Sequence, residues 1–245
     1  MAIINGNDED NALDGTPGAD LIRGYDGEDT LRGRGGNDTI LGGDDDDLIH
    51  GGDGNDDLRG GKGEDRLHGG AGGDLLTDES GNDFFDGGAG NDTIRAGEGN
   101  DTVLGGGGSD SITAGSGNDV IRAGGGRDHV VGGEGDDSIR GDGGNDTLIG
   151  NEGNDTLAGG RGNDVLTGGE GADRFAFNAG RDRITDYDDG DDQIDLRSFA
   201  GIDSFSDVRA RLSQSGNDVL FTYGEHVLRI EDTRLSVFDN DDFLY

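Results

Sequence analysis

The stretch that decides the fold is GGAGNDTIR, Gly87–Arg95, a nonapeptide that recurs with variations along most of the chain. In this register, twenty consecutive copies run from Gly6 to Thr185. The sixth position is Asp in nineteen copies, with Asn11 as the exception, and the eighth position is apolar in all twenty. A fixed period of this kind is the signature of a solenoid, in which each repeat packs only against its neighbours.

Each copy divides into a turn and a strand. Positions one to six are rich in Gly and Asp, as a tight turn requires, and the last three residues alternate out, in and out as a very short strand. A single copy cannot bury its one inward apolar side chain. We therefore expect two nonapeptides to make one coil, so that each strand pairs with the strand eighteen residues further on.

The composition excludes several classes of protein. Hydrophobic residues are only 29% of the chain, there are 54 Gly, and the formal net charge is -36. Such a chain is expected to stay disordered in plain water until its charge is cancelled. The absence of Cys excludes disulfides and thiolate metal sites. With 19 Lys and Arg against 55 acidic residues, we expect neither a nucleic-acid partner nor binding to an anionic membrane surface.

The sixth-position Asp residues are the candidate metal ligands, and a coil of two repeats sorts them into two columns. The first column holds Asp20, Asp38, Asp56, Asp74, Asp92, Asp110, Asp128, Asp146, Asp164 and Asp182. The second column holds Asp29, Asp47, Asp65, Asp83, Asp101, Asp119, Asp137, Asp155 and Asp173. Neighbouring carboxylates in a column would lie about 4.8 Å apart and repel each other by about 1 kcal/mol even in full solvent.

A hard cation between the coils would remove this repulsion. Ca²⁺ suits the position because it takes six to eight oxygen ligands from carboxylates and from backbone carbonyls. Mg²⁺ fits less well because it requires a small, rigid octahedron, and Zn²⁺ lacks its usual Cys and His ligands. The gaps within the two columns allow up to about seventeen Ca²⁺ ions, whose charge of about +34 nearly neutralises the -36 of the chain.

The repeats resemble the RTX, or hemolysin-type, calcium-binding nonapeptide GGxGxDxUx, over about three quarters of the chain. The resemblance implies an all-β fold, a right-handed parallel β-roll. It also implies that the sixth-position Asp and backbone carbonyls hold Ca²⁺ between consecutive turns on both edges. Three copies depart from the pattern, with Asp78–Glu79, Asp45 or Phe177–Asn178 in Gly positions. The sites that match the family least therefore involve Asp47, Asp83 and Asp182.

The segment after the repeats has a different composition, with ten of the thirteen Phe and Tyr at Phe175 or later. We expect a small capping core, because the open end of a solenoid must be covered. The expected elements are strands at 175–177, 184–187 and 193–196, a short helix at 208–212 after a Ser204/Asp207 capping box, and a hairpin of 218–223 with 226–230. The expected division is 1–14 as N-terminal cap and degenerate first repeat, 15–185 as β-roll, and 186–245 as cap and secretion signal.

Export is the expected fate of the chain. The N-terminus lacks a secretory signal peptide, and no stretch approaches the apolar length of a membrane span. However, ITDYDDGDDQIDL (184–196) looks like the junction that follows the repeats in many RTX exoproteins. The ending DDFLY (241–245) is similar to the uncleaved signals read by type I secretion systems, and this interpretation is favoured over the alternative that it is only the last strand of the cap. The resemblance thus implies an extracellular protein with a type I exporter as a transient partner.

Other residue groups favour plain interpretations. His50 and His68 are predicted to stack on the surface as solvated side chains rather than as a transition-metal site. Leu75 and Phe84, at the usually polar seventh position, indicate either a contact patch or an irregular coil. There is no HExxH or GxSxG motif, and the repeat accounts for every dense carboxylate cluster, so we expect no enzyme.

The predicted function is that of a secreted calcium-binding RTX protein that folds on binding multiple Ca²⁺ ions and has a structural or interaction role. One alternative is the C-terminal export and folding module of a larger RTX enzyme or toxin. Against it, Met1 lies five residues before the first repeat, as a natural start would. Another alternative is a small secreted pore-forming or host-interaction protein. The sequence predicts neither an oligomeric state nor a biological ligand.

Overall fold

Two sheets of mostly parallel strands make up most of the molecule, and the computed structural model describes residues 1–245. The 14-stranded sheet holds, in spatial order, β1 (Ala2–Asn5), β3 (Asp20–Asp26), β5 (Thr39–Asp44), β7 (Asp57–Lys62), β9 (Leu75–Thr77), β11 (Thr93–Glu98), β13 (Ser111–Ser116), β15 (His129–Glu134), β17 (Thr147–Glu152), β19 (Val165–Glu170), β21 (Arg181–Ile184), β25 (His226–Ile230), β24 (Asp218–Tyr223) and β23 (Leu212–Ser215). The 12-stranded sheet holds β2 (Ala12–Asp14), β4 (Thr30–Gly35), β6 (Leu48–Asp53), β8 (Arg66–Ala71), β10 (Phe84–Ala89), β12 (Thr102–Gly107), β14 (Val120–Gly125), β16 (Ser138–Gly143), β18 (Thr156–Ala158), β20 (Arg174–Ala176), β22 (Gln193–Asp195) and β26 (Phe243–Leu244).

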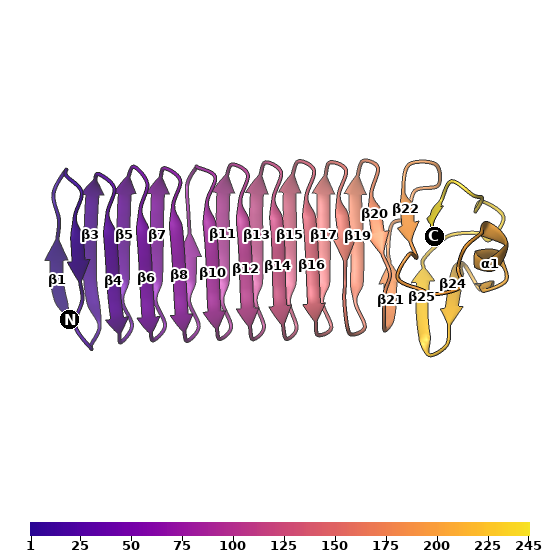
Figure 1. The fold of residues 1–245 in the computed structure, drawn as a ribbon, viewed down its shortest axis with the longest axis horizontal. Helices are drawn as coiled ribbons and strands as arrows, with labels where there is room; N and C mark the ends of the chain where they lie inside the picture. The colour runs from indigo at the N-terminus through magenta and orange to yellow at the C-terminus, as the bar shows by residue number, and fades with distance from the viewer.

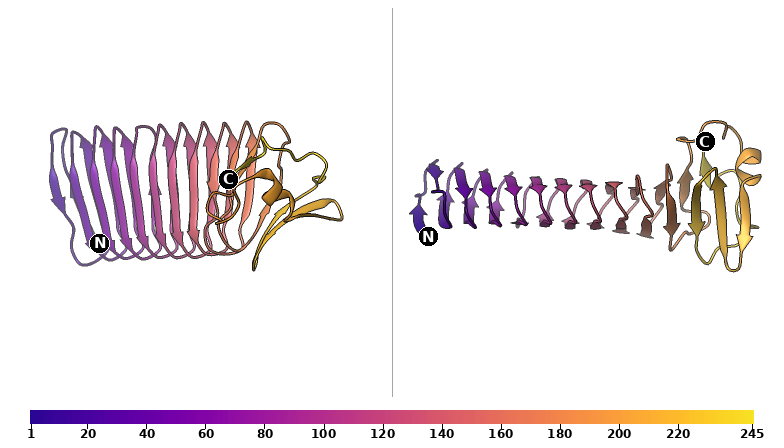
Figure 2. Two further views of the ribbon diagram at one scale, coloured as in Figure 1. Left: turned by 45° about the vertical axis from the view of Figure 1, so that its right-hand side comes forward. Right: turned by 90° about the horizontal axis from the view of Figure 1, so that it is seen from below.

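The chain crosses from one sheet to the other with every repeat, so that successive coils advance along one axis (Figure 1). The two sheets form thin facing layers, and the C-terminal segment lies at one end of the stack (Figure 2). Pairing follows the expected interval of eighteen residues, with Ile94 opposite Ile112 and Ile112 opposite Val130 in parallel register. The expected parallel β-roll is confirmed.

The strands of the roll are longer than predicted. The sequence analysis expected three-residue strands, whereas most strands have six residues and continue through the first three positions of the following repeat. The ladder persists there because backbone groups pair across coils even where the residues lack side chains, as between Gly88 and Gly106. Strands stop after three residues at β9, β18 and β20.

The interior between the sheets is a single file of apolar side chains. The eighth-position residues from Ile22 to Ile184 are at most 1% exposed, and they form one continuous core. Each contributes one large side chain per half coil, so the core is narrow. The roll consequently buries little apolar surface for its length, and its stability depends strongly on the turns.

The turns require Gly at the fourth position because neighbouring coils approach closely there. Gly90 has a φ of 140°, and a Cβ on it would clash with the carbonyl group of Gly72 in the preceding coil. Asp45 occupies the same position with a φ of 78°, and Asp tolerates the left-handed region better than most residues. The backbone therefore keeps its path at this departure from the repeat.

The C-terminal segment packs an aromatic core onto the last coils, as predicted. Phe177, Phe199 and Phe221 lie within 6.2 Å of one another, measured between ring centroids. The predicted hairpin is confirmed as β24 and β25, and β25 pairs in parallel with β21 of the roll. At the chain end, β26 pairs in parallel with β22, so Phe243 and Leu244 form the last strand of the 12-stranded sheet.

The predicted helix is present but displaced. The helix α1 (Phe205–Arg209) begins directly after Ser204, whose side chain accepts a hydrogen bond from the Asp207 N–H. The predicted range 208–212 was wrong because it began after Asp207. The helix begins at the residue after its N-cap Ser204, so Asp207 already lies in the first turn. The strand predicted at 184–187 was also displaced, since β21 ends at Ile184. No helix of the chain combines the length and hydrophobicity needed to cross a membrane.

Candidate metal centre

The nineteen predicted Asp residues lie in two columns, one along each edge of the roll. The first column lies at or just before the start of strands of the 14-stranded sheet, with Asp182 as the second residue of β21, and the second column precedes strands of the 12-stranded sheet. All nineteen are buried, with 1–3% of each residue exposed. A turn of small residues allows this burial because it leaves room for the carboxylate beneath the backbone of the neighbouring coil.

One carboxylate oxygen of each Asp is used by the fold. Oδ1 accepts a hydrogen bond from the backbone N–H of the residue eighteen positions earlier, as Asp56 does from Asp38 at 2.8 Å. The same bond joins Asp92 to Asp110 at 2.9 Å, and in the second column Asp101 to Asp119 at 2.7 Å. A hydrogen bond to a carboxylate is stronger than one between neutral groups, so these ladders tie each coil to the next.

The second oxygen has no partner within the protein. Oδ2 is buried without a hydrogen bond in seventeen of the Asp residues, namely Asp29, Asp38, Asp47, Asp56, Asp65, Asp74, Asp83, Asp92, Asp101, Asp110, Asp119, Asp128, Asp137, Asp146, Asp155, Asp164 and Asp173. Asp20 differs because its Oδ2 accepts hydrogen bonds from the backbone and hydroxyl groups of Thr16. A buried, unpartnered carboxylate oxygen is costly, and a repeated row of them indicates a missing cationic partner.

Backbone oxygens surround the same positions. A Cβ on Gly51 would clash with Asp56 Oδ2 and would lie 2.7 Å from the carbonyl oxygen of Gly69 in the next coil. The carboxylate oxygen and the carbonyl oxygen therefore face one space beside the leading Gly. This all-oxygen donor set fits Ca²⁺, which binds carboxylates and carbonyls in flexible geometry.

Burial makes these carboxyl groups hard to ionise without a cation. Burial, followed by repulsion from neighbouring Asp residues in the column, raises the pKa of Asp137 to about 7 and that of Asp110 to about 6. The same causes raise the pKa of Asp47 to about 8. Protons and metal ions should therefore compete for the columns.

The three positions that match the family least still belong to the columns. Asp47 Oδ1 accepts from the Asp29 N–H at 2.8 Å, and Asp83 Oδ1 accepts from the Asp65 N–H at 2.7 Å. Asp182 Oδ1 accepts from the Asp164 N–H at 3.1 Å. Substitution of the neighbouring Gly residues thus leaves the column hydrogen bonds in place.

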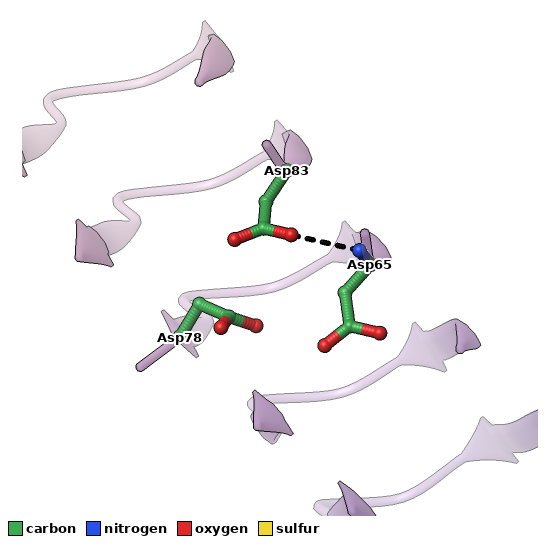
Figure 3. Close-up of side chains that lie close together, drawn as sticks. All are labelled: Asp65, Asp78 and Asp83. Atoms are coloured by element: carbon green, nitrogen blue, oxygen red, sulfur yellow. Dashed lines mark hydrogen bonds between the residues drawn. The ribbon is translucent and has the colours of Figure 1, made fainter. Parts of the chain in front are cut away.

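Two acidic residues in the columns were missed by the sequence analysis. Asp192 extends the second column because its Oδ1 accepts from the Asp173 N–H at 2.9 Å. Its spacing is nineteen residues rather than eighteen, so one inserted residue hid it from the periodic count. Asp78, which had been regarded only as a replaced Gly, directs its carboxylate towards Asp65 and Asp83 in the second column (Figure 3).

The remaining groups singled out from the sequence form no further metal site. His50 and His68 stack with ring centroids 4.8 Å apart, and burial together with the charge of His68 lowers the pKa of His50. Leu75 lies in β9 and Phe84 in β10, on different sheets, so the two do not form one patch. Phe84 instead lies against His68, with ring centroids 5.6 Å apart.

Comparisons with known proteins give partial matches among solved structures. A search of curated proteins finds no match. Among solved structures, the AlgE6R3 subunit of the Azotobacter vinelandii mannuronan C5-epimerase is 30% identical, over 49% of this chain and 78% of that one, with a TM-score of 0.42. The extracellular lipase LipA from Serratia marcescens is 17% identical with a TM-score of 0.40. The match covers 98% of this chain but only 39% of the lipase.

The family comparison is more extensive. A model of the RTX calcium-binding nonapeptide repeat, which represents four copies, matches seven overlapping segments that together span residues 5–184. The matched segments are 5–40, 32–67, 41–76, 77–112, 113–148, 122–157 and 149–184. They contain both Asp columns and nearly all strands of the roll. This chain therefore belongs to the RTX calcium-binding nonapeptide repeat family.

Proposed function

We propose that this protein is a secreted calcium-binding protein whose roll folds when Ca²⁺ fills the two Asp columns. The observation that carries the proposal is the row of buried Oδ2 atoms without hydrogen-bond partners. In each coil, Oδ2 and the carbonyl oxygens of the Gly-rich turn would hold the ion. The ion would supply the positive charge that allows a buried carboxylate to stay ionised.

The charge balance supports multiple ions. The chain carries a formal charge of -36, and the nine gaps of the first column with the eight gaps of the second accommodate up to about seventeen ions. Between unneutralised neighbours in a partly shielded site, the repulsion would reach several kcal/mol per pair. The narrow core cannot offset that repulsion, so at neutral pH the roll should form only where Ca²⁺ is available.

We propose that folding takes place outside the cell after export through a type I system. A chain that is unfolded at low Ca²⁺ can pass through a narrow exporter, and Ca²⁺ at about 10⁻⁴ to 10⁻³ M would then drive folding. The acidic and apolar ending Asp241–Tyr245 would serve as the uncleaved signal. The same ending becomes a strand of the cap through the pairing of β26 with β22.

We also propose that the protein acts without catalysis, in a structural or interaction role. We divide the chain into the calcium-dependent roll at residues 15–185 and two caps at 1–14 and 186–245. The column carboxylates support this role because their Oδ1 atoms are already used to join the coils. Limited proteolysis with and without Ca²⁺ tests the division, since cleavage sites in 15–185 should become protected on Ca²⁺ addition.

The test of the proposed function is far-UV circular dichroism during a Ca²⁺ titration of chelator-stripped protein. We expect a disordered spectrum in EDTA and a cooperative gain of β-signal as Ca²⁺ rises. A parallel Mg²⁺ titration should give little change, because Mg²⁺ demands rigid octahedral coordination. An equal β-signal in EDTA and in Ca²⁺ would overturn the proposal.

A further inference from the structure

One turn of the roll brings a third carboxylate close to two successive members of a column. Asp78 stands at the first position of its repeat, where most copies have Gly. Its carboxylate points to the gap between Asp65 and Asp83, two successive members of the second column (Figure 3). One oxygen from each of the three carboxylates lies within 4.8 Å of the other two. Glu79, the next residue, is exposed.

The Asp78 carboxylate occupies the place of a backbone carbonyl in the regular coils. A Cβ on Gly42 would lie 2.8 Å from the carbonyl oxygen of Gly60, the residue eighteen positions further on. The corresponding Cβ on Gly60 would instead clash with Asp78 Oδ2 and Asp65 Oδ2. At this turn a charged oxygen thus replaces a neutral one beside the column.

The turn holds this carboxylate in a fixed orientation. Asp78 Oδ1 accepts hydrogen bonds from the backbone N–H groups of Glu79 at 2.6 Å and Ser80 at 3.1 Å. Its Oδ2 accepts a long bond of 3.2 Å from the Gly61 N–H. Asp65 and Asp83 are 1% and 2% exposed, and each has an Oδ2 without any hydrogen-bond partner. These two unpartnered oxygens point independently to a bound cation.

We propose that Asp65, Asp78 and Asp83 form a three-carboxylate cation site that binds Ca²⁺ before and more tightly than the regular two-carboxylate sites. The proposal rests on the proposed function, since it assigns one position in the columns a special role. Affinity for Ca²⁺ rises with the number of charged ligands, so the third carboxylate should strengthen binding on the order of tenfold. Because a repeat array can fold outwards from its first formed unit, this site would start the stacking of β7 to β10.

The test compares three variants in Ca²⁺ titrations by calorimetry. Asp78→Asn removes the charge while keeping the shape, and Asp78→Gly restores the regular repeat, so folding is not at risk. Glu79→Gly is the matched control, because it also removes one acidic residue from the same turn and restores a Gly. We expect wild type and Glu79→Gly to show a first ion bound on the order of tenfold more tightly than the rest. Both Asp78 variants should lose that first class of site.

Hydrogen exchange at one Ca²⁺ per chain locates the first site. In wild type, protection should appear first in 57–104, whereas in Asp78→Gly it should not favour that region. Unchanged first-ion binding in both Asp78 variants, or an equal loss in Glu79→Gly, would overturn the three-carboxylate site. If neither wild type nor any variant binds Ca²⁺, the proposed function fails as well. If wild type and all variants bind Ca²⁺ with the same first-ion affinity, only the three-carboxylate site is refuted.

Discussion

In seventeen of the column Asp residues, the two carboxylate oxygens have different roles. In Asp110, Oδ1 accepts a hydrogen bond from the Asp92 N–H at 2.9 Å, and Oδ2 is buried without a partner. In the folded chain, the first oxygen joins two coils through this hydrogen bond. The second gains a partner only when a cation is bound, and it is the atom through which calcium and folding are coupled.

This division of roles predicts the effect of Asp110→Asn. The amide oxygen can still accept the Asp92 N–H, but the site loses one negative charge. In saturating Ca²⁺ we expect fewer bound ions and a free energy of unfolding lower by about 1–3 kcal/mol. In EDTA at neutral pH both the variant and wild type should be disordered, because the columns are then not neutralised. Calorimetry and urea unfolding measure both quantities.

The control for this prediction is Glu98→Gln, which removes one charge from an exposed residue of β11. Its Ca²⁺ stoichiometry should equal that of wild type. Equal losses in the two variants would show that total charge, rather than the column carboxylate, sets the Ca²⁺ dependence.

The residue scale also shows what the sequence could predict. The period of nine assigned the nineteen Asp residues from Asp20 to Asp182 to two columns, because these residues recur without a gap. It could not predict that Oδ1 accepts a neighbouring N–H, because that bond depends on the exact path of the turn. Asp192 escaped because one inserted residue shifts the count, and Asp78 because its importance lies in a contact between coils.

Among the structural elements, the turn at the fourth position of most repeats brings the backbones of neighbouring coils into close contact. Gly90→Ala should lower the free energy of unfolding in Ca²⁺ by about 1–3 kcal/mol, because φ is 140° and the new Cβ meets the Gly72 carbonyl. Gly107→Ala is the control, since a Cβ on Gly107 meets nothing within 4 Å. Similar urea midpoints for the two variants would contradict the close approach of coils.

The strands contribute through a single inward residue each. Ile112 in β13 is fully buried, whereas its neighbour Thr113 is exposed on the outer face. We expect Ile112→Ala to cost about 2–5 kcal/mol in thermal or urea unfolding with Ca²⁺ present, and Thr113→Ala to cost little. A small effect of Ile112→Ala would mean that the core contributes less than the alternation of burial indicates.

Elements outside the repeat were harder to predict. The hairpin of β24 and β25 was placed correctly because Gly224 marks its turn between two alternating segments. The pairing of β26 with β22 joins residues about fifty positions apart, and no local sequence pattern predicts such a contact. Strand length in the roll was underestimated because paired Gly residues carry no side-chain pattern.

At the scale of the whole molecule, the raised pKa values of the columns predict a dependence on pH. An unfolded Asp titrates near 3.9, whereas burial raises the pKa of Asp47 and of Asp182 to about 8 in the folded chain. Between these values the folded, calcium-free chain binds more protons than the unfolded chain. Its stability should therefore be greatest below about pH 4 and should fall as pH rises towards 8.

The measurement is circular dichroism in EDTA as the pH is lowered from 8 to 4. We expect β-signal to appear on acidification, because protons then neutralise the columns in place of Ca²⁺. The Ca²⁺ affinity should decrease over the same range, since its ligands must be deprotonated. A spectrum in EDTA that stays disordered from pH 8 to pH 4 would contradict the assignment of buried column carboxylates.

The most direct test of the central claim is a crystal structure of the calcium-loaded protein with anomalous difference density. We predict two rows of peaks, one along each edge of the roll. Each peak should lie about 2.3–2.6 Å from the Oδ2 atom of a column Asp, with one peak beside Asp65, Asp78 and Asp83. A folded roll whose columns hold no cation between neighbouring coils would contradict the account.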